Sequence, residues 1–123
     1  MNDNSKKRRI GFVYAWQGLK TAIRTERNFR LHVVAAFLVI ATGCAFRLEA
    51  LQWSILMLAS GMVLTAELIN TAVEKMMDHL TPEFHPCTKV VKDMAAAAVL
   101  VSAVFAAAAG LFIFLPELYA RIT

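Results

Sequence analysis

Three long apolar stretches divide the chain, with short polar segments between them. Residues 33–46, 51–66 and 94–115 carry no formal charge. A helix needs about 20 mostly apolar residues to cross a hydrocarbon core of about 30 Å. The third stretch is long enough by itself, and the first two are long enough if their helices continue into the flanking residues. The pattern therefore predicts an all-α membrane protein, with transmembrane helices over residues 31–48, 51–80 and 90–118.

A shorter segment before the first span has a different pattern. Between residues 11 and 30, apolar side chains such as Phe12 and Ile23 recur every three or four positions, while most basic side chains fall on the other side. This spacing is typical of an amphipathic helix that lies in the plane of the lipid headgroups. Residues 1–9 are expected to form a disordered basic tail. A simple membrane anchor would explain most of this segment, but not the acid Glu26 among basic neighbours.

Composition and charge agree with a single membrane domain covering residues 1–123. Hydrophobic residues make up 59% of the chain, only 18% of residues are charged, and mean hydropathy is +0.56, which excludes a small soluble fold. Of the 13 Lys and Arg residues, all but Arg47 and Arg121 lie before the first span or between the second and third. This bias predicts a multi-pass protein of the plasma membrane, with the N-terminus and the 75–93 loop cytoplasmic and the C-terminus outside. The basic charge is thus a topology signal, and no nucleic-acid partner is expected.

The end of the second span carries a stripe of polar side chains. Successive members are three, four and four residues apart, which places them on one face of an α-helix: Glu67, Asn70, Glu74 and Asp78. A lone acid here would indicate a solvated helix end. Three acids and an amide in register, on a helix that is otherwise apolar, favour a functional role instead, because buried carboxylates need a partner. Three spans cannot enclose such a row, so we expect a homo-oligomer with the stripe at a subunit interface.

The predicted topology gathers further polar residues at the same membrane face, from the surface helix and from the loop before the third span: Glu26, Glu83, His85, Lys89, Lys92 and Asp93. Carboxylates supply the oxygen ligands of Mg²⁺, and Lys92 can contact a phosphate as a point charge. Glu67 lies deepest, where loss of water suits a carboxylate to proton abstraction. Phosphoryl transfer to a membrane-resident alcohol would need these groups, although they do not require it.

Several other kinds of site have no support in the sequence. The chain has no P-loop and no protein-kinase catalytic loop. Its three histidines are scattered, which makes a zinc site implausible. Cys44 lies in the first span and Cys87 in the cytoplasmic loop, so we expect neither a disulfide nor a metal site from them.

The polar stripe belongs to a longer signature that resembles the small bacterial integral-membrane diacylglycerol kinase family. The signature residues are Glu67-Leu-Ile-Asn70-Thr71-Ala72-Val73-Glu74, then Asp78 and Lys92-Asp93. Two further segments resemble the Gram-positive undecaprenol kinase branch of that family: Thr25-Glu26-Arg27-Asn28-Phe29-Arg30-Leu31-His32 and Glu83-Phe84-His85-Pro86. The resemblance covers nearly the whole chain.

The resemblance implies a homotrimer that transfers the γ-phosphate of ATP to a lipid hydroxyl, with Mg²⁺ as cofactor. It makes Glu67 the proton acceptor, places Asn70 and Lys92 with it as catalytic residues, and gives Asp78 a supporting role. The metal ligands would be Glu26 and Glu74. Nucleotide contacts would come from Tyr14, Glu26, Glu74, Glu83, Phe84, His85, Lys92 and Asp93. The lipid would contact Trp16, Leu19, Lys20 and Glu67.

Two positions depart from the family pattern. Ala97 stands where the family commonly has a glycine, which bears on helix packing. His32 stands where the Gram-negative diacylglycerol kinases tend to have an acid, which favours the undecaprenol kinase branch and leaves the choice of lipid open.

The leading interpretation is a kinase that converts undecaprenol to undecaprenyl phosphate, with diacylglycerol as the alternative substrate, phosphorylated to phosphatidic acid. A small pore or holin-like protein would also fit three short spans and an alanine-rich third helix. Such a protein has no need of the acidic stripe or of Lys92-Asp93. A subunit of a proton-coupled transporter would use Glu67 as a proton relay and would work without nucleotide.

Overall fold

The computed structural model describes the backbone of residues 3–123, together with their side chains except those of Ser5, Arg8 and Arg9. Within this range the chain forms four helices, α1 (Asp3–Thr25), α2 (Arg27–Phe46), α3 (Ala50–Leu80) and α4 (Pro86–Ile122). Helices α2, α3 and α4 are each long and apolar enough to cross a membrane. The prediction of an all-α fold with three membrane helices is therefore confirmed.

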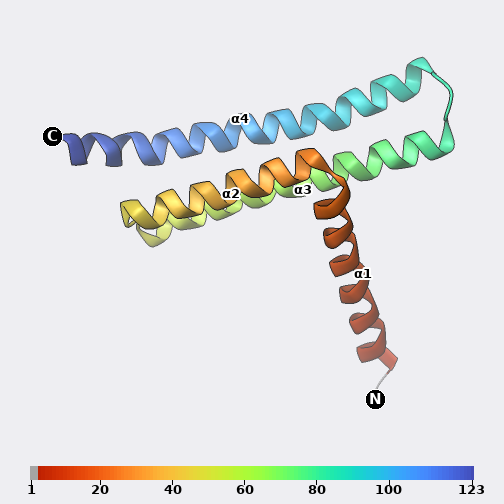
Figure 1. Cartoon of the computed structure of the whole chain (residues 1–123), viewed down its shortest axis with the longest axis horizontal. Helices are drawn as coiled ribbons and strands as arrows, with labels where there is room; N and C mark the ends of the chain where they lie inside the picture. The colour runs from red at the N-terminus through yellow and green to blue at the C-terminus, as the bar shows by residue number, and fades with distance from the viewer. Residues whose placement is uncertain (1–2) are drawn as a thin grey trace.

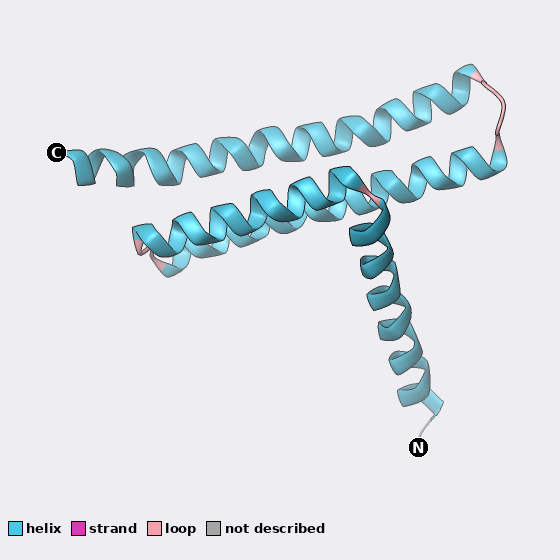
Figure 2. Ribbon diagram, in the orientation of Figure 1, coloured by secondary structure: helices cyan, strands magenta, loops and turns pink. Residues whose placement is uncertain are grey.

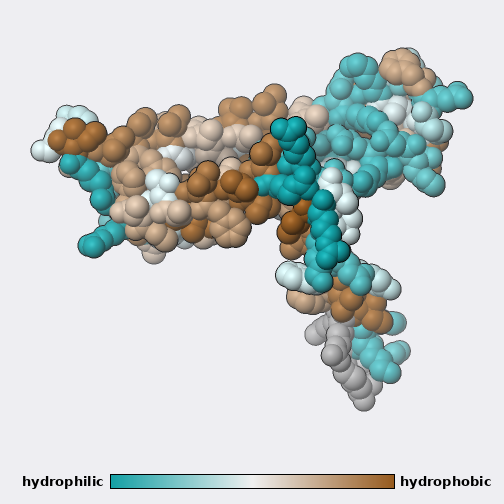
Figure 3. All heavy atoms as spheres, viewed as in Figure 1, coloured by the Kyte–Doolittle hydropathy of each residue, from teal (hydrophilic) through white to brown (hydrophobic). Residues whose placement is uncertain are grey.

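The three membrane helices form an elongated up-and-down bundle from which α1 departs crosswise (Figure 1). Helices α2 and α4 both pack mainly against α3. Helices α3 and α4 continue past the point where α1 joins α2, and the short α3–α4 loop closes this extension (Figure 2). We refer to this extension, residues 74–93, as the polar arm. Figure 3 shows hydrophilic side chains gathered there and on α1, while hydrophobic side chains cover most of the bundle.

Several predicted helix boundaries were wrong, and the first of them concerns α1. This helix begins at Asp3, so residues 3–9 are helical rather than a disordered tail, while residues 1–2 lie outside the described residues. It ends at Thr25 instead of residue 30, because Glu26 has an extended backbone and forms the N-cap of α2. Residues 24–28 are all polar but include neither glycine nor proline, so no helix-breaking residue type indicated this break.

The other boundaries differ for local reasons. Helix α4 begins at Pro86 rather than residue 90, since proline suits the first helical position and the His85 ring accepts a hydrogen bond from the Cys87 amide at 3.1 Å. It also continues through Pro116 to Ile122, four residues beyond the predicted end. A proline removes one helical hydrogen bond, and the helix runs on for six residues beyond Pro116 despite this loss. Helix α2 ends two residues early at Phe46, because Arg47 is left-handed with a φ of 53°.

The apolar core lies at the end of the bundle opposite the polar arm. Its buried centre is formed by Leu48, Leu56 and Ile113. Beside it, the Phe46 ring meets the Phe114 ring edge-on at 5.6 Å, and Arg121 donates to the Phe46 carbonyl at 2.7 Å. These contacts fasten the outer ends of α2 and α4. Side chains at the polar end are therefore not needed for this apolar packing and can serve a chemical function.

Gly43 provides a test of this core. A Cβ added there would lie 2.7 Å from a ring carbon of Trp53 and 3.1 Å from Leu48 Cδ1. We predict that Gly43→Ala destabilises the bundle by about 1–3 kcal/mol, because the indole must shift within packed surroundings. SDS-titration unfolding in detergent measures this effect. The matched control is Gly11→Ala, whose added methyl meets nothing within 4 Å, so equal loss of stability in the two variants would contradict this account of the packing.

Candidate active site

The polar stripe of α3 begins with a buried carboxylate. Glu67 is only 4% exposed, and its Oε2 lies 3.9 Å from His32 Nε2 on α2. Among the described residues, His32 is the one basic side chain within ion-pair distance of this carboxylate. Phe29, which is 1% exposed and lies one turn before His32, anchors that part of α2 against the bundle. The predicted proton acceptor thus lies inside the protein, facing a histidine from the neighbouring helix.

The next stripe residues continue toward the polar arm. Asn70 is 6% exposed, and its Nδ2 donates to Glu74 Oε1 at 3.4 Å. Its Oδ1 is buried and has no hydrogen-bond partner among the described residues. A buried oxygen without a partner carries a free-energy cost, which a bound cation or donor would remove. The stripe therefore offers one carboxylate and one unused amide oxygen side by side.

Glu26 is brought to the same region by the break between α1 and α2. Its Oε1 accepts a hydrogen bond from Lys75 Nζ at 3.0 Å and another from Thr25 Oγ1 at 3.0 Å. The Lys75 hydrogen bond, followed by the Thr25 hydrogen bond, holds the pKa of the Glu26 carboxyl below its usual value. This ion pair connects the α1–α2 junction to α3 one residue after Glu74.

The polar arm is held by ion pairs and a hydroxyl contact. Lys92 on α4 binds Asp78 on α3, and Lys89 pairs with Asp93 at 2.6 Å. The Thr81 and Thr88 hydroxyls share a hydrogen bond of 2.9 Å across the loop. The supporting position predicted for Asp78 is thus beside Lys92, so that the Lys92 charge lies within reach of the stripe.

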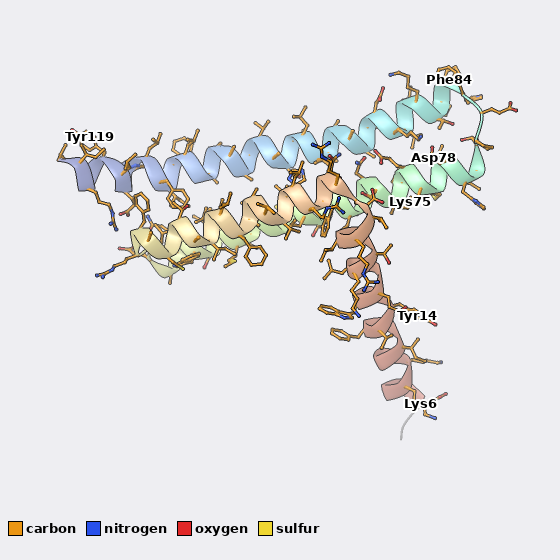
Figure 4. All side chains as sticks on the ribbon, viewed as in Figure 1. Lys6, Tyr14, Lys75, Asp78, Phe84 and Tyr119 are labelled. Carbon is orange, nitrogen blue, oxygen red and sulfur yellow. The ribbon has the colours of Figure 1, made fainter. Side chains whose placement is uncertain are left out.

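Some predicted nucleotide-binding residues are not brought together within one chain. Figure 4 shows Tyr14 far out along α1, Lys75 and Asp78 on α3, and Phe84 at the distant end of the polar arm. The Phe84 ring is 82% exposed, and Glu83 is exposed beside it. His85 instead caps α4. Of the predicted nucleotide contacts, Glu74 belongs to the stripe itself. Glu26 is joined to α3 by Lys75, and Lys92 is joined to the stripe by Asp78.

A groove of about 610 Å³ separates α1 from α3. Its walls are mostly small and apolar, with Glu26 and Lys75 at one end. Of the predicted lipid contacts, Leu19 lines this groove, while Trp16 and Lys20 interact with each other, with Lys20 Nζ 5.8 Å from the ring centroid. Glu67 is not among the groove's lining residues. Trp16, Leu19 and Lys20 thus share one face of α1, while Glu67 is buried on α3.

The oxygen atoms of the stripe and of Glu26 are candidate ligands for Mg²⁺. In the described part of the chain, no three His, Cys, Asp or Glu side chains come together as a complete metal site. Mg²⁺, however, is commonly held by one or two carboxylates plus substrate phosphates. Glu26, Glu74 and the unpartnered Asn70 Oδ1 are hard oxygen donors of that kind. The residues present fit an ion that arrives with a nucleotide.

Two residues near the stripe were missed as site residues by sequence reasoning. Lys75 binds Glu26, and His32 faces Glu67. In the sequence, His32 stands out as part of the segment 25–32 and as a departure from a family pattern. Lys75 counts there only among the basic residues that orient the chain in the membrane. Neither contact has a periodic signal, because each joins two different helices. Ala97, the other departure, is exposed on α4.

Comparison with known proteins decides the family. The model of the prokaryotic diacylglycerol kinases matches residues 13–114. The chain belongs to this family. An undecaprenol kinase of Bacillus subtilis is 44% identical over 107 residues, which is 87% of each chain. A diacylglycerol kinase of Synechocystis is 39% identical over 110 residues, covering 89% of this chain and 63% of the relative. The diacylglycerol kinase of Escherichia coli is 32% identical over 93 residues, or 76% of each chain.

Family membership confirms the resemblance seen in the sequence. The relatives are undecaprenol and diacylglycerol kinases, and both of these lipids are alcohols. The pore and transporter interpretations are therefore set aside. The match begins within α1 and ends within α4, so it includes the α1–α2 junction, the whole polar stripe and the polar arm.

The lowered pKa of Glu26 leads to a prediction. A depressed carboxyl pKa stabilises the fold at pH values above the unfolded pKa, and this contribution is lost as the pH falls through the folded pKa. The attachment of α1 to α3 should therefore weaken only in acid. We predict that Lys75→Met raises the Glu26 pKa, as measured by ¹³C-carboxyl NMR titration in micelles. Lys89→Met, which removes a pair on the polar arm, serves as control. An unshifted Glu26 in Lys75→Met would contradict the assignment of cause.

Proposed function

We propose that the chain transfers the γ-phosphate of ATP to the hydroxyl of undecaprenol, giving undecaprenyl phosphate. Membership of a lipid kinase family supports the reaction class. The 44% identity with an undecaprenol kinase, against 39% and 32% with two diacylglycerol kinases, supports the lipid. The observation that carries the proposal is a buried carboxylate, Glu67, at the point where an apolar helix becomes polar.

Glu67 acts as the proton acceptor in this mechanism. The lipid hydroxyl gives its proton to the carboxylate as its oxygen bonds to the γ-phosphorus, and the bond from that phosphorus to ADP breaks. Burial suits Glu67 to this role, because water is excluded from the reacting hydroxyl. Asn70 lies one turn further along the same face, and its Nδ2 orients Glu74. Lys92, from α4, contributes positive charge near the phosphates.

Glu26 and Glu74 would hold Mg²⁺, with the Asn70 oxygen as a further donor. When bound, the ion neutralises charge on the triphosphate. Glu26 must then exchange Lys75 for the metal, and the released ammonium group remains beside the groove. This exchange is accessible, since the Lys75 side chain is 62% exposed.

The remaining predicted nucleotide contacts favour an assembly, and we propose a homotrimer. Tyr14, Phe84 and their neighbours lie apart from the stripe within one chain (Figure 4). Many large apolar side chains of the three membrane helices face outward, which leaves surface for lipids and for other subunits. The position of the polar arm and the distribution of basic residues support a cytoplasmic N-terminus and α3–α4 loop, with the C-terminus outside.

A radiolabelled-ATP assay with both candidate lipids tests the function. Purified protein in detergent receives undecaprenol and diacylglycerol side by side with Mg²⁺, and lipid products are separated by chromatography. We expect label in undecaprenyl phosphate at a rate at least about ten-fold above that in phosphatidic acid. Label in phosphatidic acid alone would support the diacylglycerol alternative. No labelled lipid of either kind would contradict the proposal.

We predict that Glu67→Gln abolishes transfer, because the amide cannot accept the proton, while ATP binding is largely retained. A loss of kcat of at least about 10²-fold is expected for an essential base. Nucleotide affinity is measured separately by equilibrium binding. Glu117→Gln is the control, since that carboxylate lies at the opposite end of the bundle beside Gln52. If Glu67→Gln lost nucleotide affinity to the same extent as rate, Glu67 would not be the base.

A further inference from the structure

The distance between the His32 and Glu67 side chains indicates what can bind between them. Nε2 and Oε2 are 3.9 Å apart, which is too long for a hydrogen bond but within ion-pair distance. One oxygen atom can lie about 2.8–3.0 Å from both atoms, and each of those distances is that of an ordinary hydrogen bond. The two side chains are therefore close enough for a single hydroxyl group to form a hydrogen bond with each of them.

The two side chains differ in accessibility. The Glu67 side chain is 5% exposed, whereas that of His32 is 28% exposed. His32 is therefore the side of the pair that an entering molecule meets first. It can donate through Nε2–H, while a carboxylate can only accept. A hydroxyl placed between them would accept from the imidazole and donate to the carboxylate, so that both of its polar functions are satisfied.

His32 also lines an apolar cavity of about 410 Å³ between α2, α3 and α4. Apart from His32 and Ser60, its lining residues are alanine, glycine and larger apolar side chains. Glu67 is not among these lining residues, so His32 is where a hydroxyl held by the pair meets the apolar space, which suits an alcohol with a hydrocarbon chain. Water alone would leave most of this space unfilled.

We propose that His32 is a catalytic residue that holds the acceptor hydroxyl together with Glu67. This inference rests on the proposed kinase function and adds a second contact to the reacting oxygen. Nε2–H donates to that oxygen, and the hydroxyl proton points at the Glu67 carboxylate. As the oxygen bonds to the γ-phosphorus, the proton passes to Glu67 and ADP leaves with the electron pair of the broken bond. His32 keeps its proton throughout and fixes the direction from which the oxygen attacks.

Two substitutions at position 32 test the proposal. His32→Leu keeps an apolar side chain but removes the donor, and His32→Gln places an amide N–H close to the position of Nε2. For the lipid substrate we expect kcat of His32→Leu to fall at least about ten-fold, while the KM for ATP stays unchanged. His32→Gln should recover to within about three-fold of wild-type kcat. Ser54→Ala, which removes an exposed hydroxyl near the start of α3 and outside this cavity, should leave kcat unchanged.

Each outcome separates the alternatives. An active wild type together with a fully active His32→Leu would overturn the inference and leave the kinase function intact. Equal losses in His32→Leu and His32→Gln, with a raised KM for ATP, would assign His32 a structural role and also overturn it. A wild type that phosphorylates no lipid would overturn the proposed function itself. Size-exclusion chromatography and circular dichroism of each variant show that the compared proteins are folded alike.

Discussion

A carboxylate buried in a membrane helix is the constraint on which the rest of this structure depends. Glu67 is almost inaccessible, yet the sixteen residues before it carry no charge. Such a group is costly in an apolar medium unless neighbouring groups compensate it. The neighbour that can compensate it is the His32 imidazole on α2, 3.9 Å away, whereas Asn70 donates to Glu74 further along α3 instead. An ionisable side chain inside a membrane helix is by default a candidate functional group, and the chain belongs to the prokaryotic diacylglycerol kinase family.

The bundle divides its tasks between its two ends. At the outer end, Arg121 and the edge-on contact of Phe46 with Phe114 clamp the helices around a small apolar core. At the other end, the contacts are ion pairs and a hydrogen bond between two hydroxyl groups. Such contacts rearrange at a lower free-energy cost than packed side chains do. Stability thus resides mainly where no chemistry is proposed. The polar arm and the α1–α2 junction keep exposed charges, which the proposed nucleotide and metal would bind in exchange for their protein partners.

The break at Glu26 links these tasks. An extended residue between two helices turns α1 out of the bundle and directs its own carboxylate toward Lys75 on α3. If α1 and α2 formed one continuous helix, Glu26 would lie on the side of that helix and away from the stripe. The turn also creates the groove between α1 and α3, beside the membrane surface where a lipid alcohol and a water-soluble nucleotide can meet. Geometry at a single residue therefore joins the surface helix to the proposed site.

The sequence by itself determined the three spans, the amphipathic first helix and the register of Glu67, Asn70 and Glu74, because hydropathy and helical spacing are local properties of one segment. It did not place the helix break at Glu26, since no glycine or proline lies near that residue. Only the tertiary structure decided that Lys75 binds Glu26, that His32 faces Glu67 and that the Asn70 oxygen is left without a partner. These contacts depend on where two helices cross and how each is rotated about its axis, and the pattern of a single helix carries no information about either.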